Sequence, residues 1–355
     1  MNPPSPLASR SIIRWGILGC GDVTEMKSGP ALQKAEGSTV VAVMRRDGVK
    51  AADYASRHGV ARWYDDARAL LADPEVDAVY IATPPGAHAD AALLAAAAGK
   101  PCYIEKPFAR NTTECDAILK AFHMAKLPVF VAYYRRCLPR FVRVAQLLAE
   151  GAIGHLTSVN VRFACPPPHI EDPAHPPWRL DAAYAGAGLF LDLGSHALDL
   201  LDHLFGPLEG VQGHAASVST PLPVENLVAM SFMVAGRVPA TASWNFASAL
   251  SADEIVLCGT AGRLVFSAYG NEPLRLESSK GIEIFECPDP PHVQQPLIQT
   301  VVDALRGCGK CPSTGESARR TSAVMDEVLK HYYGGRSDAF WSWPGTWPGR
   351  PMLSD

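Results

Sequence analysis

Four ionisable side chains lie within the otherwise apolar segment LFLDLGSHALDLLDHLF, residues 189–205. Asp192, His196, Asp199 and His203 follow one another at spacings of four, three and four residues. An α-helix advances about 100° per residue, so these four positions fall on one narrow stripe. Because leucine and phenylalanine line the other sides, the pattern predicts a buried helix whose polar stripe meets other polar groups or faces a cavity.

Three interpretations of this stripe are compatible with the pattern alone. The first is an ordinary solvated face. The second is a metal site, because Asp and His one helical turn apart can bind the same ion. The third is an acid–base pair facing a substrate pocket, because histidine titrates near neutral pH. The elements that position the stripe must decide between them.

Composition excludes several classes of protein. The chain has 355 residues, enough for two domains, with 48% hydrophobic and 19% charged residues. The net charge is −4 without a basic block, so no nucleic-acid partner is indicated. No apolar run has the length of a membrane span or a signal peptide. Nine scattered cysteines favour a reducing cytoplasm, and the lone CxxC, Cys308 and Cys311, lacks the second pair that a zinc site needs.

The first third of the chain alternates apolar segments with helical ones. We predict strands within the segments 12–23, where the strand runs into Gly19-Cys20-Gly21, 38–47, 76–85, 101–108 and 127–136, and an alanine-rich helix at 88–100. Pro30 limits the helix after the first strand to a late start or places the proline in its first turn. Strands that alternate with helices predict an α/β fold with a doubly wound parallel sheet, the Rossmann type.

The first predicted strand runs into a glycine turn. Gly19 and Gly21 fit the G-x-G-x-x-G fingerprint, while Thr24 takes its third position. In this context the glycines let the backbone approach a pyrophosphate, and the start of the next helix, Asp22 and Val23, stabilises its charge. Glycines of an ordinary tight turn are the alternative. The order of strand, turn, helix and strand favours dinucleotide binding.

The end of the second predicted strand bears on the choice of cofactor. An acidic residue there binds the ribose hydroxyls of NAD, whereas an arginine accepts the 2′-phosphate of NADP. This chain has Arg45 and Arg46, and no carboxylate before Asp47. We therefore predict a preference for NADP(H), with NAD(H) possible if both arginines are only solvated surface charges.

Three motifs of the chain resemble those of the Gfo/Idh/MocA oxidoreductase family, which includes glucose-fructose oxidoreductase and inositol dehydrogenase. Glu105-Lys106-Pro107 resembles the EKP motif of the family, and GAGLFLDLGSHALDL resembles its GGGxxxDxGxHxxD helix. ATPPGAHAD is similar to its TPNxxH segment, with Pro85 in place of Asn. The first two motifs occur in order, about ninety residues apart, and the resemblance covers nearly the whole chain.

The resemblance implies two domains, which we place at 1–132 and 133–355. The first is the Rossmann domain, and the second is an α/β domain with a large, open, mostly antiparallel sheet. Short β-branched and aromatic segments in the second half agree with such a sheet. In the family this sheet often forms the subunit interface, which implies a homodimer or homotetramer.

Catalytic roles transfer from the family motif by motif. The resemblance implies that Lys106 lies by the nicotinamide ribose and contacts the substrate hydroxyl, after a Lys106–Pro107 peptide that is usually cis. It also implies that Asp192 and His196 complete the site. Oxidation of a secondary alcohol needs a base that titrates near neutral pH, so His196 is our general acid/base, with Asp192 holding its tautomer or binding a hydroxyl. Lys106 polarises the carbonyl oxygen, so no metal is required.

The remaining residues bind ligands or support the site. We predict cofactor contacts from Gly19, Gly21, Asp22, Val23, Arg45, Arg46, Thr83, Pro84, His88, Glu105 and Lys106. We predict substrate contacts from Lys106, Tyr134, Trp178, Arg179, Asp192 and His196. Trp178 and Arg179 belong to a Pro-rich insertion, 166–181, that we expect over the substrate site. Asp199 is expected to hydrogen-bond its neighbours, and His203 to be structural.

The predicted function is a cytoplasmic NADP(H)-dependent dehydrogenase or reductase of a sugar, cyclitol or related polyol. A reductase of a non-sugar carbonyl or of a trans-dihydrodiol is the first alternative. A cofactor-binding sensor without turnover is the second, but it would not need Lys106, Asp192 and His196 together. The aromatic, Pro-rich tail is expected to pack against the protein's own surface or a sister subunit.

Overall fold

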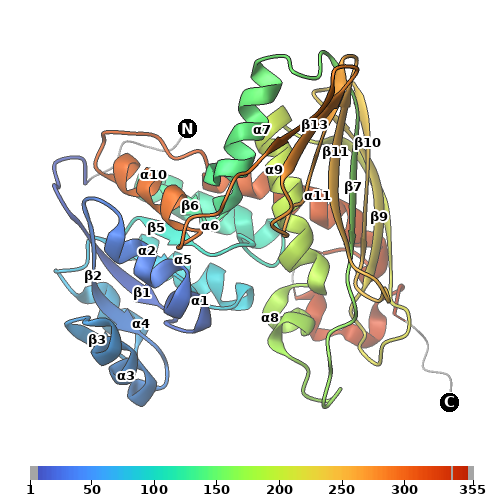
Figure 1. Ribbon diagram of the computed structural model, residues 1–355. Helices are drawn as coiled ribbons and strands as arrows, with labels where there is room; N and C mark the ends of the chain where they lie inside the picture. The colour runs from blue at the N-terminus through green and yellow to red at the C-terminus, as the bar shows by residue number, and fades with distance from the viewer. Residues whose placement is uncertain (1–6, 337–338, 351–355) are drawn as a thin grey trace. The chain divides into compact units, whose positions relative to one another are not determined.

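The parallel sheet predicted for the first third of the chain is present in the computed structural model, which describes residues 7–336 and 339–350 (Figure 1). Its strand order is β3-β2-β1-β4-β5-β6, with β1 (Ile13–Leu18), β2 (Ser38–Met44), β3 (Arg62–Tyr64), β4 (Ala78–Ile81), β5 (Cys102–Ile104) and β6 (Val129–Val131). Five of these strands confirm the predicted segments. β3 was not predicted, because it is three residues long and not buried, and so lacks an apolar run.

Helices flank this sheet, and most of them connect one strand to the next. They are α1 (Asp22–Met26), α2 (Ser28–Lys34), α3 (Gly48–His58), α4 (Ala67–Ala72), α5 (His88–Ala97), α6 (Thr112–Ala125) and α10 (Gln295–Leu305). Pro30 lies in the first turn of α2, as predicted, where its missing N–H is not needed. Asp47, Asp66 and Asn111 cap α3, α4 and α6 by accepting a backbone N–H. The caps explain why these helices begin where they do.

The chain divides into two compact units, and the first is not continuous in sequence. Of the described residues, it contains 7–138 together with 289–319, and the second contains 139–288, 320–336 and 339–350. The predicted division has a single boundary after residue 132, and the structure differs from it in the return of 289–319 to the first unit. The segment 289–319 returns because α10 buries apolar side chains in the first unit. This helix lies beside α2 (Figure 1) and places Leu297, Ile298 and Val301 in the core of that unit.

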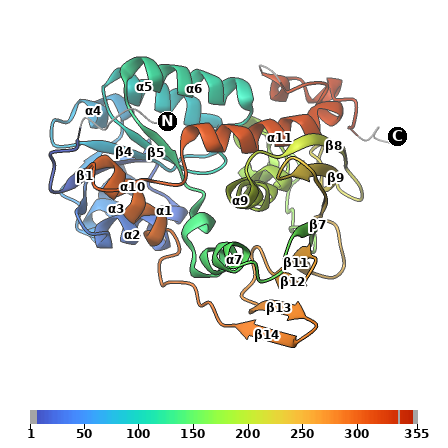
Figure 2. The same cartoon turned by 90° about the horizontal axis from the view of Figure 1, so that it is seen from above.

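The second unit is built on the large open sheet that the sequence predicts. Its strand order is β14-β13-β12-β11-β7-β10-β9-β8, and the pairs are antiparallel except β7 with β10. The strands are β7 (Leu156–Ala164), β8 (Glu209–Ala216), β9 (Leu227–Val234), β10 (Val238–Asn245), β11 (Ala252–Gly259), β12 (Gly262–Phe266), β13 (Leu274–Ser278) and β14 (Gly281–Phe285). Figure 2 shows β13 and β14 at one end of this sheet.

One face of this sheet is covered and the other is exposed. The helices of the second unit are α7 (Pro139–Ala149), α8 (Ala182–Ala185), α9 (Ser195–Phe205) and most of α11 (Gly315–Tyr333). Phe141 packs on Phe266, and Phe190 on Trp244, with ring centroids 6.1 and 4.9 Å apart. The opposite face presents polar and small side chains, among them Asn160, Thr241, Ser231 and Ala229. The homodimer or homotetramer through this sheet stays a prediction.

The part of the tail that the structure describes packs against its own unit. Trp347 is buried, its ring lies 4.6 Å from that of Tyr333, and its indole N–H donates to Phe340 O at 2.9 Å. This agrees with the expectation for the aromatic tail.

No helix within residues 7–336 and 339–350 has both the length and the apolar character needed to cross a membrane.

Candidate active site

The glycine turn after β1 uses its two glycines differently. Gly19 has φ +89°, and a Cβ there would lie 2.7 Å from Thr83 Cγ2, so no other residue fits without strain. At Gly21 a Cβ would meet no atom closer than Gly19 O at 3.9 Å. Thr24 is buried and its hydroxyl donates to Gly21 O at 2.7 Å, which closes the first turn of α1. The side of the turn at Gly21 is therefore open, as the approach of a pyrophosphate requires.

The two arginines after β2 are held differently. Arg45 is half buried, and its Nη1 donates to Cys20 O at 3.3 Å, so its guanidinium lies beside the glycine turn. Arg46 is exposed. Asp47, the first carboxylate after the strand, caps α3 by accepting from Lys50 N at 3.2 Å. Of the two predicted cofactor arginines, Arg45 is the one that lies beside the turn, together with Asp22 at the start of α1.

A cluster of charges joins α1 to α3. Arg57 donates to both carboxylate oxygens of Glu25, at 2.7 and 2.8 Å, and His58 Nε2 lies 2.7 Å from Glu25 Oε2. The hydrogen bonds from Arg57 outweigh desolvation and lower the pKa of Glu25 to about 2. The ionised carboxylate therefore fastens the helix that begins at the glycine turn.

We expect this cluster to make stability depend on pH. The pKa of Glu25 lies below its ordinary value of 4.5, so its contribution to stability is present above pH 4.5 and is lost as the pH falls toward 2. Glu25→Gln should lower the free energy of unfolding by about 1 kcal/mol at pH 7 and by less at pH 3. Urea denaturation of both proteins, with the exposed Glu36→Gln as control, measures this. Equal differences at both pH values would contradict the assignment.

The loop after β4 carries three predicted cofactor residues. The hydroxyl oxygen of Thr83 is buried and, among the described residues, lacks a hydrogen-bond partner, which fits a bond to a cofactor. Pro84 follows, half buried. His88 is fully buried, with Nε2 2.8 Å from Thr83 O and Nδ1 3.1 Å from Pro107 O, and burial lowers its pKa. Its ring has no surface for a ligand, so its geometry suits positioning two loops better than contacting the cofactor.

The EKP motif forms a buried turn after β5. Glu105 is 7% exposed, and its carboxylate accepts from the Tyr80 hydroxyl at 2.6 Å and from Lys106 N at 3.1 Å. The Lys106–Pro107 peptide is cis, as predicted. Tyr134 is half buried, and the Arg135 guanidinium lies 5.2 Å from the centre of its ring.

In the second unit, Asp192 does not lie on the regular α-helix that the spacing predicts. It belongs to a π-helical turn, Phe190–Gly194, which precedes α9. A Cβ at Gly194 would lie 2.4 Å from the Phe190 ring, so the glycine admits that buried ring. The Tyr269 hydroxyl donates to Leu193 O at 2.5 Å and occupies a carbonyl of the turn. A π-turn is wider than an α-turn, so Asp192 lies in a different local backbone geometry from the three later positions, which belong to the regular helix α9.

The rest of the stripe has three different environments. His196, in the first turn of α9, is 3% exposed, and its ring centroid lies 6.4 Å from that of Tyr269. Asp199 is 1% exposed and accepts from the Thr321 hydroxyl at 3.4 Å, as expected of a residue that hydrogen-bonds its neighbours. His203 is exposed. The interpretation as an ordinary solvated face therefore fits only His203.

The Pro-rich loop reaches the proposed catalytic segment. Arg179 Nε lies 3.3 Å from Asp192 Oδ2, and its guanidinium is 4.3 Å from the ring centre of Trp178. The Arg179 side chain remains 53% exposed. The structure thus brings together three predicted substrate residues. His175 instead pairs with Asp172 within the loop, at 2.7 Å.

The residues that hold the segment around Asp192 were not predicted from the sequence. Asp253 accepts from the backbone N–H groups of 268–270 at 2.7 to 2.8 Å, and so fixes Tyr269. Buried Glu225 accepts from Gly188 N at 2.9 Å, and burial raises its pKa. Arg336 donates to Gly186 O at 2.7 Å. Asp253 lies on β11, Glu225 in the loop before β9 and Arg336 after α11, so these partners are distant in sequence and no local motif signals them.

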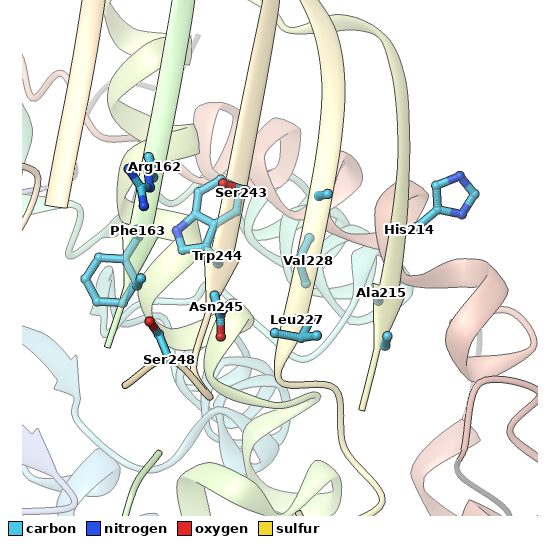
Figure 3. Close-up of a pocket in the computed structure, with 13 residues that line it drawn as sticks. Arg162, Phe163, His214, Ala215, Leu227, Val228, Ser243, Trp244, Asn245 and Ser248 are labelled. Carbon is cyan, nitrogen blue, oxygen red and sulfur yellow. The ribbon is translucent and has the colours of Figure 1, made fainter. Parts of the chain in front are cut away.

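A hollow of about 420 Å³ lies on the exposed face of the second sheet (Figure 3). Its lining comes from β7, β8, β9 and β10, and includes Arg162, His214, Ser243 and Asn245. It contains neither Asp192 nor any other proposed catalytic residue. Within the described residues, no group of three or more His, Cys, Asp or Glu side chains could hold a metal ion.

Comparison with known proteins identifies both units. The family described as "Oxidoreductase family, NAD-binding Rossmann fold" matches residues 13–133, and the GFO/IDH/MocA C-terminal domain matches 141–265. Oxidoreductase P35 of Formosa agariphila is 35% identical over 317 residues, which cover 89% of this chain and 98% of that protein.

Two further similarities are more distant. A trans-1,2-dihydrobenzene-1,2-diol dehydrogenase of Danio rerio is 26% identical, covering 90% of this chain and 96% of its own length. The solved structure of a levoglucosan dehydrogenase with NADH and levoglucosan matches with a TM-score of 0.79 at 21% identity, covering 90% of this chain and 96% of that one. The latter is a likeness of fold.

Proposed function

Because the chain belongs to the Gfo/Idh/MocA family of oxidoreductases, with an NAD-binding Rossmann fold, we propose that it is an NADP(H)-dependent dehydrogenase or reductase of a sugar, cyclitol or related polyol. One observation carries the proposal. Asp192 is paired with Arg179 at 3.3 Å, four residues before the buried His196. A carboxylate and a guanidinium side by side offer an acceptor and donors to neighbouring hydroxyls, next to an acid–base group.

The roles of the catalytic residues follow from their chemistry. His196 takes the hydroxyl proton when an alcohol is oxidised and returns it when a carbonyl is reduced. Asp192 stabilises the resulting imidazolium or binds a substrate hydroxyl. Lys106 presents a cation to the reacting oxygen, where negative charge develops. When bound, the nicotinamide accepts or supplies the hydride.

The residues around the glycine turn suit a dinucleotide. The open side at Gly21 and the buried Thr83 hydroxyl, which has no partner among the described residues, would hold it, and Glu105 would support the site by accepting from Lys106 N at 3.1 Å. Arg45 supports NADP(H), because a guanidinium binds a phosphate with paired hydrogen bonds. Arg46, being exposed, supports it less.

We expect Arg45→Asp to shift the coenzyme preference from NADPH to NADH. Loss of charge-assisted hydrogen bonds and repulsion of the 2′-phosphate should weaken NADPH binding about 10- to 100-fold. Fluorescence titration measures both dissociation constants, with Arg46→Asp as the matched variant. An unchanged ratio in Arg45→Asp would remove the basis for NADP(H).

The proposed function itself is tested by titrating the unmodified protein with NADPH and NADH side by side. Tight binding of NADPH supports the proposal and leads to a screen of sugars, cyclitols and polyols with NADP. Preference for NADH keeps the oxidoreductase and leaves Arg45 the role of holding the glycine turn through Cys20 O, without binding a 2′-phosphate. Binding of neither would contradict the mechanism.

A second candidate function has a specific observation in its favour. The Danio rerio relative, named for a trans-dihydrodiol of benzene, spans 90% of this chain. A trans-dihydrodiol also presents two neighbouring secondary hydroxyls, which the Arg179–Asp192 pair would bind as it binds those of a polyol. The screen should therefore include such a diol, and its turnover in place of polyols would favour this alternative.

A further inference from the structure

The glutamate of the EKP motif belongs to a buried network that extends beyond the motif. Glu105 Oε1 accepts from the Tyr80 hydroxyl and from Gln294 Nε2, both at 2.6 Å, while Oε2 accepts from Lys106 N at 3.1 Å. Tyr80 has no exposed surface and Gln294 is 1% exposed. Three donors therefore fix both oxygens of one carboxylate away from water.

Gln294 reaches this carboxylate from the return segment, 189 residues later in the chain. It immediately precedes α10, whose Leu297 and Ile298 lie in the core of the first unit. The Tyr103 hydroxyl donates to Gln294 Oε1 at 3.2 Å, so the amide nitrogen must face Glu105. The apolar contacts of α10 thus bring the amide to the EKP turn, and Tyr103 orients it.

The two tyrosines act as neutral donors. Their rings stack with centroids 5.2 Å apart. Burial, followed by the charge of Glu105, raises the pKa of both Tyr80 and Tyr103 well above the ordinary value, so both hydroxyls keep their protons at neutral pH. Gln294 is the one member of the network that both donates to Glu105 and accepts from a tyrosine.

We propose that Gln294 is a positioning residue of the oxidoreductase reaction. It holds the Glu105 carboxylate in one orientation, and that carboxylate holds the backbone N–H of Lys106. Gln294 therefore acts on the proposed cofactor and catalytic residues without touching a ligand. This inference rests on the proposed function of Glu105 and Lys106.

Two substitutions of nearly the same shape test the proposal. Gln294→Met removes both hydrogen bonds, and we expect kcat/KM to fall about 10- to 100-fold, with weaker NADPH binding. In Gln294→Glu the new carboxyl can donate to Glu105 only while it is protonated, which its buried position beside another carboxylate favours at lower pH. NADPH affinity and kcat of Gln294→Glu, relative to the unmodified protein, should therefore recover between pH 8 and pH 6, whereas those of Gln294→Met should not.

The control is Gln299→Met, the same change on the same helix, because Gln299 bonds to the backbone of Glu36 and not to the network. It should match the unmodified protein. If both Gln294 variants behaved alike at pH 8 and pH 6, or like the control, the proposal would be overturned. Should they fail to fold by circular dichroism, Tyr103→Phe removes only the hydroxyl that orients Gln294, and it should lower kcat/KM about 3- to 10-fold; no change would overturn the proposal.

Measurements of NADPH binding and of turnover distinguish the failure of this inference from the failure of the proposed function. If the unmodified protein binds NADPH but turns over no substrate, the proposed function fails, and the pH-dependent recovery of NADPH binding in Gln294→Glu still supports the positioning role. If turnover is found and the Gln294 variants match the control, the proposed function stands and the positioning role is overturned.

Discussion

Replacement of Lys106 by methionine should lower kcat about 10³-fold and leave the dissociation constant of NADPH nearly unchanged. The reason lies in where charge develops. As hydride leaves or reaches the reacting carbon, negative charge gathers on its oxygen, and a fixed ammonium stabilises that charge more than it stabilises the bound substrate. Methionine keeps the length and apolar body of the side chain but provides no cation and no proton.

Stopped-flow and steady-state assays with the best substrate of the screen measure kcat, and fluorescence titration measures NADPH binding. Lys120→Met is the matched control, because Lys120 is exposed on α6. Its kcat should equal that of the unmodified protein. A Lys106→Met protein with normal turnover would show that the electrophile is another group. A large loss of NADPH affinity with unchanged kcat would instead make Lys106 a cofactor residue only.

The sheet of the first unit could be predicted from sequence because a short run of apolar residues indicates a buried strand. Residues 78–81 and 102–104 are wholly buried strands, and both lie inside predicted segments. The short β3 has partly exposed residues and pairs only with β2, so its sequence carries no apolar run. The return of α10 to the first unit could not be predicted either, because the sequence pattern of an amphipathic helix does not indicate which hydrophobic core its apolar face covers.

Candidate site residues that belong to a local sequence motif could be predicted, whereas features of the site that depend on long-range contacts could not. Gly19 and Asp192 were predicted as site residues from local patterns. The π-turn was not, because it depends on Gly194 admitting the Phe190 ring and on the Tyr269 hydroxyl reaching Leu193. Such contacts join residues far apart in sequence, so spacing alone yields a regular helix in their place.

The long-range partners share a physical role. Tyr269 bonds a carbonyl next to Asp192, and Gln294 bonds the carboxylate next to Lys106. Each restricts the backbone or the carboxylate beside a proposed catalytic residue. Preorganisation of this kind determines how well a fixed charge stabilises a transition state. It therefore makes variants of these residues as informative as variants of the motifs.

Replacement of His196 by asparagine should lower kcat about 10²- to 10⁴-fold, the range typical for loss of a general acid or base. Asparagine can still hydrogen-bond but cannot take up a proton near neutral pH. The pH profile of kcat should therefore lose the limb that an imidazole contributes, while NADPH affinity is unchanged. A loss of kcat with the limb retained would assign the proton transfer to another residue, with His196 only positioning the substrate.

His203→Asn provides the control, since His203 is exposed on the same helix and lies two turns further along. It should leave both kcat and its pH profile unchanged. Asp192→Asn separates the two roles of the carboxylate. If Asp192 stabilises the imidazolium, that variant should lower kcat and shift the pH limb to lower pH, because the charged form of the histidine loses its partner. If Asp192 binds a substrate hydroxyl instead, KM should rise and the limb should stay in place.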